Sequence, residues 1–343
     1  NDLKVRSRTN TLTQNILENS VYYSNTTNEA HSDRLRNDLS GVLEIKLDST
    51  SSIKIDAKGS LGRNDYNNYY QTENLTEQNT VINNSNRRTQ IHNNTGNESV
   101  NILYRKKFHK VGKTFSLNLT QSYNQTRQDG LLYNESHFFN PLTSNLLSRD
   151  TTNQNKKSTL FYQTNSAKAT YTHPLSAVSF LIFNYSLSNN NSTREKLTYD
   201  LGLNNKYDIL NDSLSNKFRY NYLTNSTGLD YHLIKGKTDL SFGGDISNTN
   251  FSQHNFFTDT TGRSNYFNFF PRASFSYKFS SFTNLQFSYS GYTTQPTIDQ
   301  VQPLTDNSDP LNIIIGNPDL KQSFTNSFQL FFADVKVMTE RYL

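Results

Sequence analysis

The chain has 343 residues, and only 33% of them are hydrophobic, against about 45–50% in ordinary globular proteins. Aromatic residues nevertheless reach 13%, all of them Phe or Tyr, which argues against disorder. The small net charge of +5 without a basic stripe disfavours a nucleic-acid partner, and the absence of Cys excludes disulfides, thiolate metal sites and cysteine nucleophiles. This composition suits a β-barrel, because its lumen can be wet and only its outer face must be apolar.

Alternating apolar and polar residues are the dominant pattern along the chain. Residues 43–47 (LEIKL) and 53–57 (IKIDA) alternate strictly, and the spacing of Phe218, Tyr220 and Tyr222 repeats the pattern. Successive side chains of a strand point to opposite faces, so each such segment has one apolar and one polar face. The pattern predicts an all-β, antiparallel up-and-down barrel region of about 12 strands. The predicted strands are 10–24, 34–48, 53–63, 96–108, 114–126, 158–172, 178–189, 216–233, 238–250, 265–279, 285–294 and 323–335.

The connections between these strands alternate in length. Short turns are predicted at 48–52, 109–113, 173–176, 235–237 and 280–283, and long polar loops at 64–95, 127–157, 190–215, 251–264 and 295–322. Outer-membrane barrels have short periplasmic turns and long outer loops. We therefore place the turns containing Gly112, Pro174 and Gly236 on the periplasmic side. Strands longer than the ~9–11 residues of one bilayer crossing are expected to continue outside as hairpins.

The segment from Asn284 onwards carries the most specific motif. The strand-like run 284–290 (NLQFSYS) is followed by Pro296 and then by Gly316, Asn317, Pro318, Asp319, Leu320 and Lys321. Gly316 permits a positive φ, Pro318 forces the preceding residue to be extended, and Asp319 can accept backbone hydrogen bonds. The motif is therefore predicted to have a structural role in setting the start of the next strand.

This order of features resembles the late barrel of TonB-dependent outer-membrane receptors. In that family an aromatic strand, a loop with a Pro-anchored helix-like turn and the sequence GNPDLKPE precede the next strand. Gln322 and Ser323 stand where the family usually has Pro-Glu. Residues 101–108 and 112–117 also resemble a hairpin of the outer-membrane barrel branch of the same superfamily.

The resemblance implies a cell outer-membrane location and a barrel of about 22 strands around an N-terminal plug domain. Residues 1–343 are expected to be the barrel region, incomplete and without a plug or a TonB-contacting segment. The implied partners are outer-membrane lipid, TonB and an imported ligand. The outer loops are also candidates for contact with a surface lipoprotein or another envelope protein.

Motifs of catalysis and metal binding are missing from the sequence. The seven His residues do not pair at metal-ligand spacing, and no G-x-S-x-G, H-E-x-x-H or G-x-x-x-x-G-K-[ST] motif occurs. Residues 306–309 (DNSD) resemble an acidic calcium loop but lack the Gly and the bidentate Glu of an EF-hand. We therefore expect no enzyme activity, catalytic residue, metal or cofactor, and the ligand-binding residues stay unidentified.

Pairs of adjacent aromatic residues recur along the chain. Phe269-Phe270 favours the aromatic girdle at the membrane interface. The pairs at 69–70, 138–139 and 256–257 fall in predicted outer loops, where they are candidates for contact with a ligand, such as a sugar, or with a partner.

Three functions fit this sequence. The first is the barrel portion of a TonB-dependent transporter, which imports a ligand bound by outer loops and lumen. The second is a non-transporting barrel that acts as a structural or interaction component of an envelope complex. The third is an exported, soluble β-rich binding module.

Overall fold

One curved antiparallel sheet makes up most of the molecule in a computed structural model, which describes residues 2–17, 20–301, 305–309, 314–317 and 319–334. In sheet order its strands are β1 (Asp2–Leu17), β2 (Ser20–Lys46), β3 (Ser51–Thr76), β4 (Val81–Lys107), β5 (Thr114–Phe139), β6 (Leu146–Pro174), β7 (Ser179–Leu201), β9 (Asn216–Lys235), β10 (Thr238–Asn255), β11 (Thr260–Lys278), β12 (Thr283–Thr294) and β15 (Ser323–Asp334). These twelve strands and the antiparallel order confirm the predicted fold class.

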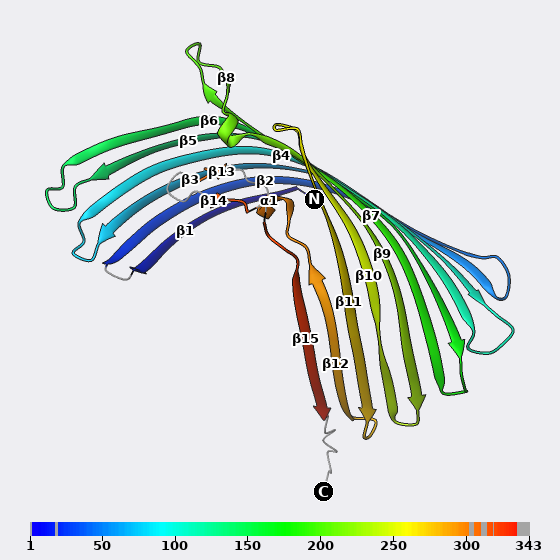
Figure 1. Cartoon of the computed structure of the whole chain (residues 1–343). Coiled ribbons are helices and arrows are strands. Elements are labelled where there is room, and N and C mark those ends of the chain that lie inside the picture. Colours follow the sequence, from blue (N-terminus) through cyan, green and yellow to red (C-terminus); the bar gives the residue numbers. More distant parts are fainter. Residues whose placement is uncertain (1, 18–19, 302–304, 310–313, 318, 335–343) are drawn as a thin grey trace, which may run out of the picture.

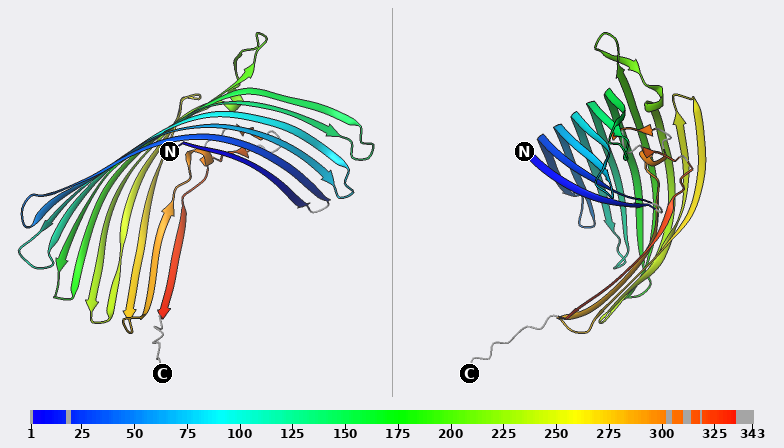
Figure 2. Two further views of the ribbon diagram at one scale, coloured as in Figure 1. Left: turned by 180° about the vertical axis from the view of Figure 1, so that it is seen from behind. Right: turned by 90° about the vertical axis from the view of Figure 1, so that its left-hand side faces the viewer.

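Short elements accompany the main sheet. β8 (Tyr207–Leu210) pairs with β7, η1 (Asp212–Leu214) follows it, and α1 (Ile298–Val301), β13 (Thr305–Asp306) and β14 (Ile314–Ile315) lie between β12 and β15. Figures 1 and 2 show the sheet as an arc with a concave and a convex face. Its edge strands, β1 and β15, do not pair with each other in the described part of the chain. None of the helices described is long and apolar enough to cross a bilayer.

Most segments predicted as long polar loops are parts of strands instead. Residues 64–95 leave the sheet only at 77–80, and residues 127–157 only at 140–145. Polar side chains hydrogen-bond across these extensions. For example, the side-chain amide of Asn74 donates to Oδ1 of Asn83 at 2.8 Å. Since both faces are polar there, the apolar alternation that marks a strand is missing. The loop assignment was wrong for these residues, whereas the expected extension of strands into long hairpins is confirmed.

Other predicted boundaries also change. The predicted strand 10–24 was wrong, because β1 ends at Leu17 and β2 begins at Ser20, so two strands share this segment. The predicted loop 190–215 contains the end of β7, β8 and η1, and 251–264 contains the ends of β10 and β11. By contrast, residues 295–322 lie outside the main sheet where the structure describes them.

A continuous apolar belt crosses the convex face. In one row of directly paired residues, the pairing runs from Leu43 through Ile55, Ile102, Leu119 and Ala167 to Leu187. In a second row, Leu240 pairs with Phe275, Phe275 with Phe287, and Phe287 with Leu330. Belt side chains are exposed, as Leu330 (72%) and Phe269 (56%) show. An exposed apolar surface on these strands suits contact with hydrocarbon, and it agrees with the girdle predicted for Phe269. The same prediction was wrong for Phe270, which pairs with Asp245 and faces the concave side, because successive residues of a strand point to opposite faces.

Tight turns join the strands at the end of the sheet opposite the long hairpins. Gly112 and Gly236 have φ values of +80° and +59°, which a side chain would disfavour, and both lie in turns that the sequence predicts. In the β2–β3 turn, Asp48 accepts hydrogen bonds from the backbone N–H of Thr50 at 2.6 Å and from the Thr50 hydroxyl at 2.7 Å. Lys106 of β4 donates to the Thr50 and Ser51 hydroxyls at 2.7 and 2.6 Å. The Lys106 side chain thus links the β2–β3 turn to β4 by hydrogen bonds.

Asp48 gives the turn a defined pH dependence. The hydroxyl and then the backbone N–H of Thr50 hold the pKa of the Asp48 carboxyl well below its usual range. A carboxyl group whose pKa is lower in the folded than in the unfolded state contributes its full stabilisation at pH values above the unfolded pKa of about 3.9. This contribution is lost as the pH falls from there towards the folded pKa. We expect the difference in unfolding free energy between wild type and Asp48→Asn to shrink below about pH 4. Urea titrations in detergent at several pH values measure it, and a difference that stays constant with pH would contradict this role.

A charged cluster lies on the concave face at the height of the belt. The Arg272 guanidinium donates to Asp230 at 2.6 and 2.5 Å and also contacts Asp245, and the Asn184 amide donates to Asp230 at 3.2 Å. Asp230 is only 6% exposed. Gly228 makes room for the cluster, because a Cβ there would overlap the Asp245 carboxylate. Opposite faces of the same strands therefore carry hydrocarbon-compatible and charged side chains.

Candidate ligand-binding site

The described residues between β12 and β15, which we call the strap, lie on the concave side of the sheet (Figures 1 and 2). Its first part turns at α1, which Pro296 precedes. The backbone N–H of Thr297 donates to Gln300 Oε1 at 2.9 Å, and the N–H of Gln300 donates to Thr297 Oγ1 at 3.3 Å. This reciprocal pair is a capping box, which satisfies two N–H groups at the helix start. The expected Pro-anchored helix-like turn is confirmed.

Hydrogen bonds join the two ends of the strap to each other and to β11. The Gln322 amide donates to Asn268 of β11 at 2.7 Å, and the Asn268 amide donates back to Gln322 at 3.2 Å. Gln295 joins them, because its amide donates to Gln322 Oε1 at 2.8 Å. These neutral amide pairs fix where the strap leaves and rejoins the sheet.

The far part of the strap contacts strands on the other side of the arc. Asp309 forms an ion pair with Arg87 of β4 at 2.6 Å, and the Asn307 amide donates to Gln154 of β6 at 3.1 Å. Lys156 also contacts Asn307. Arg87 lies over the Tyr70 ring, 4.3 Å from its centroid, so one member of a predicted aromatic pair helps to hold the strap. Over the described residues, no group of three His, Asp or Glu side chains is placed to hold a metal ion.

A cavity of about 820 Å³ lies between the first part of the strap and the sheet. Its inner end is aromatic: Phe218 and Tyr220 of β9 are 1% and 5% exposed, and Val301 of α1 covers them at 6% exposure. Phe251 of β10 stands beside Tyr220, with ring centroids 5.5 Å apart at 48°. The sequence pattern gave β9 an apolar face at these positions but did not show that this face is concave and turned towards the strap.

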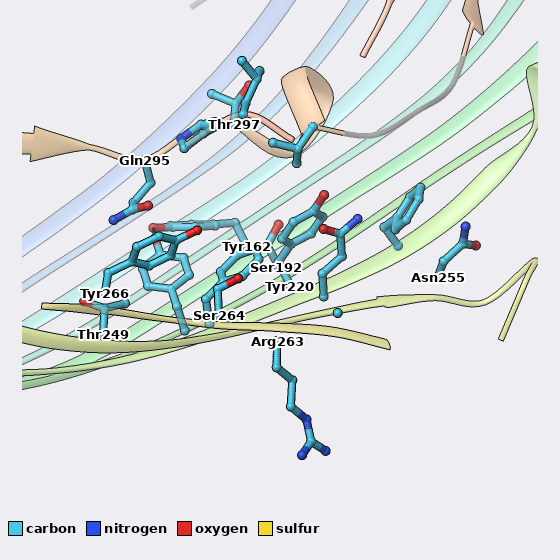
Figure 3. A pocket seen from close by; sticks show the side chains of 18 of the residues that line it. Tyr162, Ser192, Tyr220, Thr249, Asn255, Arg263, Ser264, Tyr266, Gln295 and Thr297 are labelled. Atoms are coloured by element: carbon cyan, nitrogen blue, oxygen red, sulfur yellow. Dashed lines mark hydrogen bonds between the residues drawn. The ribbon is translucent and has the colours of Figure 1, made fainter. Parts of the chain in front are cut away.

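Neutral polar groups supply the rest of the cavity wall. The Tyr162 hydroxyl donates to the Asn190 carbonyl oxygen at 3.1 Å and meets the Tyr222 hydroxyl at 3.2 Å. Thr249, whose hydroxyl lies 2.9 Å from that of Thr224, also lines the cavity. Figure 3 shows Tyr162, Tyr220 and Tyr266 around the space, with Arg263 extending away from it on the other side of β11. Arg263 is the one charged residue among the described lining residues.

The motif at Gly316–Lys321 supports this cavity. The backbone N–H of Asn317 donates to the Gln300 carbonyl oxygen of the capping box at 2.7 Å. Asn317 Oδ1 accepts the N–H of Asp319 at 2.9 Å, so in the described residues Asn317 is the side-chain acceptor that the sequence suggested for Asp319. Leu320 lines the cavity, β15 begins at Ser323, and Lys321 lies between them. Pro318 lies outside the described residues.

The remaining aromatic pairs take other positions. Tyr69 and Tyr70 lie within β3, Phe138 and Phe139 end β5, and the pair at 256–257 follows β10. The Phe256 ring is covered by Arg219, at 5.0 Å from its centroid, and by Lys217 at 5.6 Å. None of the three pairs lines the cavity under the strap. The lining residues Tyr162, Tyr220 and Phe251 were not predicted, because spacing along a strand does not reveal which face is covered.

One comparison with known proteins identifies a family. The model of the outer membrane protein β-barrel family matches residues 106–335, more than half of the chain. Among solved structures, the chain is similar to the unliganded ferric citrate transporter FecA at 12% identity, with a TM-score of 0.43 over 79% of this chain. That match covers 42% of the FecA chain, so the present chain spans less than half of it. No curated protein matches the chain. The chain belongs to the outer membrane protein β-barrel family, and its place is the outer membrane.

Proposed function

We propose that the chain is the barrel portion of a TonB-dependent transporter, which imports a ligand bound under the strap. The observation that carries the proposal is a cavity on the concave face, walled by β9, β10, β11 and the strap. A barrel wall that is apolar outside and carries a lined cavity inside suits the binding of a ligand before import. The GNPDLK motif, which resembles the TonB-dependent receptors, supports the transport assignment. In this proposal the ligand, TonB and lipid are the partners, and the chain has no catalytic role.

Cellular uptake tests the proposal. A strain lacking the full gene is grown beside its parent in a complex medium, and depletion of medium compounds is followed by mass spectrometry. We expect at least one compound to stay unconsumed in the deletion strain. Removal of TonB, or collapse of the proton gradient, should reproduce this defect because the transport is energised. Equal depletion profiles in deletion and parent strains would contradict transport.

A non-transporting role in an envelope complex is the second candidate. The long hairpins of β3–β6 favour it, because strands of 26 to 29 residues far exceed the ~9–11 of one crossing and offer a polar surface to other proteins. In the same strains, this function predicts unchanged depletion together with loss of an envelope protein that co-purifies with the full-length chain. The outer-membrane location replaces the soluble binding module considered from the sequence.

A further inference from the structure

We infer that the cavity under the strap binds an uncharged, polyhydroxylated ligand with flat apolar faces, namely a short saccharide chain. This assignment of a substrate class rests on the proposed function. It follows from three properties of the cavity: aromatic surfaces, neutral hydrogen-bonding groups, and the absence of an inward-facing charge among the described lining residues.

Aromatic rings form the apolar part of the wall. Tyr220 and Phe251 are inclined at 48° to one another, and Phe218 lies 6.3 Å from Tyr220, centroid to centroid. Phe218 and Tyr220 are buried under Val301, at 1% and 5% exposure, and support the wall from behind. The half-buried rings of Tyr162, Phe251 and Tyr266 line the cavity and present its accessible aromatic surfaces. A sugar ring has an apolar face of C–H groups, which can cover such a surface and remove it from water.

Hydroxyl and amide groups form the polar part. The Tyr162 hydroxyl hydrogen-bonds to Asn190 and to Tyr222 beside the aromatic cluster, and Ser192 and Gln253 line the same space. Hydroxyls and amides can donate as well as accept, so they match the hydroxyl groups around the rim of a sugar ring. Aromatic faces next to neutral donors and acceptors therefore complement both parts of a saccharide.

The charge of the lining excludes other ligand classes. Arg263, the charged residue of the described lining, extends to the opposite side of β11 (Figure 3). The ion pair of the strap, Arg87 with Asp309, joins β4 and lies outside the cavity lining. A carboxylate chelate or a cationic peptide would lose water in the cavity without gaining a counter-charge, which costs several kcal/mol per ion. A neutral ligand avoids this cost.

Volume limits the length of the ligand. The cavity of about 820 Å³ lies inside the ~300–1,000 Å³ range of sites that enclose small molecules. It accommodates a few sugar rings and not a folded polypeptide.

Calorimetry on the purified full-length protein in detergent tests the assignment. The neutral probes are maltotriose, cellotriose and N,N′,N″-triacetylchitotriose, and the charged probes are ferric citrate and trilysine. We expect at least one neutral probe to bind and both charged probes to fail. Tyr266, which is half-buried and lines the cavity, supplies the stacking test. Tyr266→Ala should weaken that binding about tenfold, whereas Tyr266→Phe should retain it, because stacking needs the ring and not the hydroxyl.

Two further variants keep the test independent of folding defects. Asn265→Ala should leave binding unchanged, because Asn265 is adjacent to Tyr266 in β11, so its side chain is on the opposite face, and it is not among the described lining residues. Gln253→Leu, which removes a half-buried amide from the lining at similar volume, should weaken binding. Heat modifiability on gels shows whether each variant is folded.

Each result decides between the two proposals. Failure of all three neutral probes with the folded protein, or binding of a charged probe in the cavity, overturns the saccharide assignment. Calorimetry involves neither TonB nor uptake, so saccharide binding by a protein whose deletion leaves medium depletion unchanged would overturn transport alone. Conversely, a protein required for energised uptake that binds only charged probes would overturn the saccharide assignment alone.

Discussion

Replacing Arg272 by Met is expected to lower the free energy of unfolding by about 3 kcal/mol. The variant leaves Asp230 and Asp245 without their shared cation on the concave face, and Asp230 is 6% exposed. An uncompensated buried charge costs more than the lost pair contributed, because each carboxylate remains desolvated and repels the other. Urea titration of the full-length protein in lipid vesicles measures the effect.

A second variant separates charge from packing. Combining Arg272→Met with Asp230→Asn and Asp245→Asn removes the repulsion and should recover most of the lost stability. Neutral residues of similar size often replace a buried ion network at little cost. If Arg272→Met alone were as stable as wild type, the cluster would not contribute to stability.

Replacing Phe242 by Arg is expected to cost about 2–4 kcal/mol in lipid vesicles. Phe242 is 50% exposed, and its cross-strand partners, Tyr231 and Ala273, are also on the belt. A guanidinium at this position would face hydrocarbon, where it finds neither water nor a partner. Unfolding titrations of vesicle-inserted protein give the cost.

The adjacent residue provides the control. Ser241 precedes Phe242 in β10, so its side chain faces the concave side, and its cross-strand partners are His232 and Ser274. Ser241→Arg should therefore cost much less than Phe242→Arg. Equal costs at the two positions would show that the belt does not face lipid.

The parts of the fold that the sequence predicts are those where the two faces of a strand meet different surroundings. Ile53 and Ile55 alternate with Lys54 and Asp56 because one face meets hydrocarbon, and this placed the first half of β3 correctly. The second half of β3, from residue 64, is an equally regular strand. Because both of its faces are polar, it lacks the alternation of apolar and polar residues that predicts a strand. The β1–β2 boundary was missed for another reason, because apolar residues stand on both sides of it: Ile16 and Leu17 end β1, and Val21, Tyr22 and Tyr23 follow the start of β2.

The candidate site could not be predicted from the pattern of the individual strands, for a different reason. Phe218 and Tyr220 alternate like belt residues, yet Val301, some 80 residues later, covers them. A local pattern cannot distinguish an aromatic face turned towards lipid from one turned towards a distant segment of the same chain. The family resemblance predicted a helix-like turn after Pro296, but not what this helix covers.

The unequal lengths of the strands give the barrel wall a sloping rim. β6 has 29 residues, whereas β12 and β15 have 12 each, and the strap leaves the wall where it is lowest. We expect large particles that approach from outside to meet the high hairpins of β3–β6 first. We expect a small solute to reach the cavity beside β11 over the low side, so that the slope would select solutes by size.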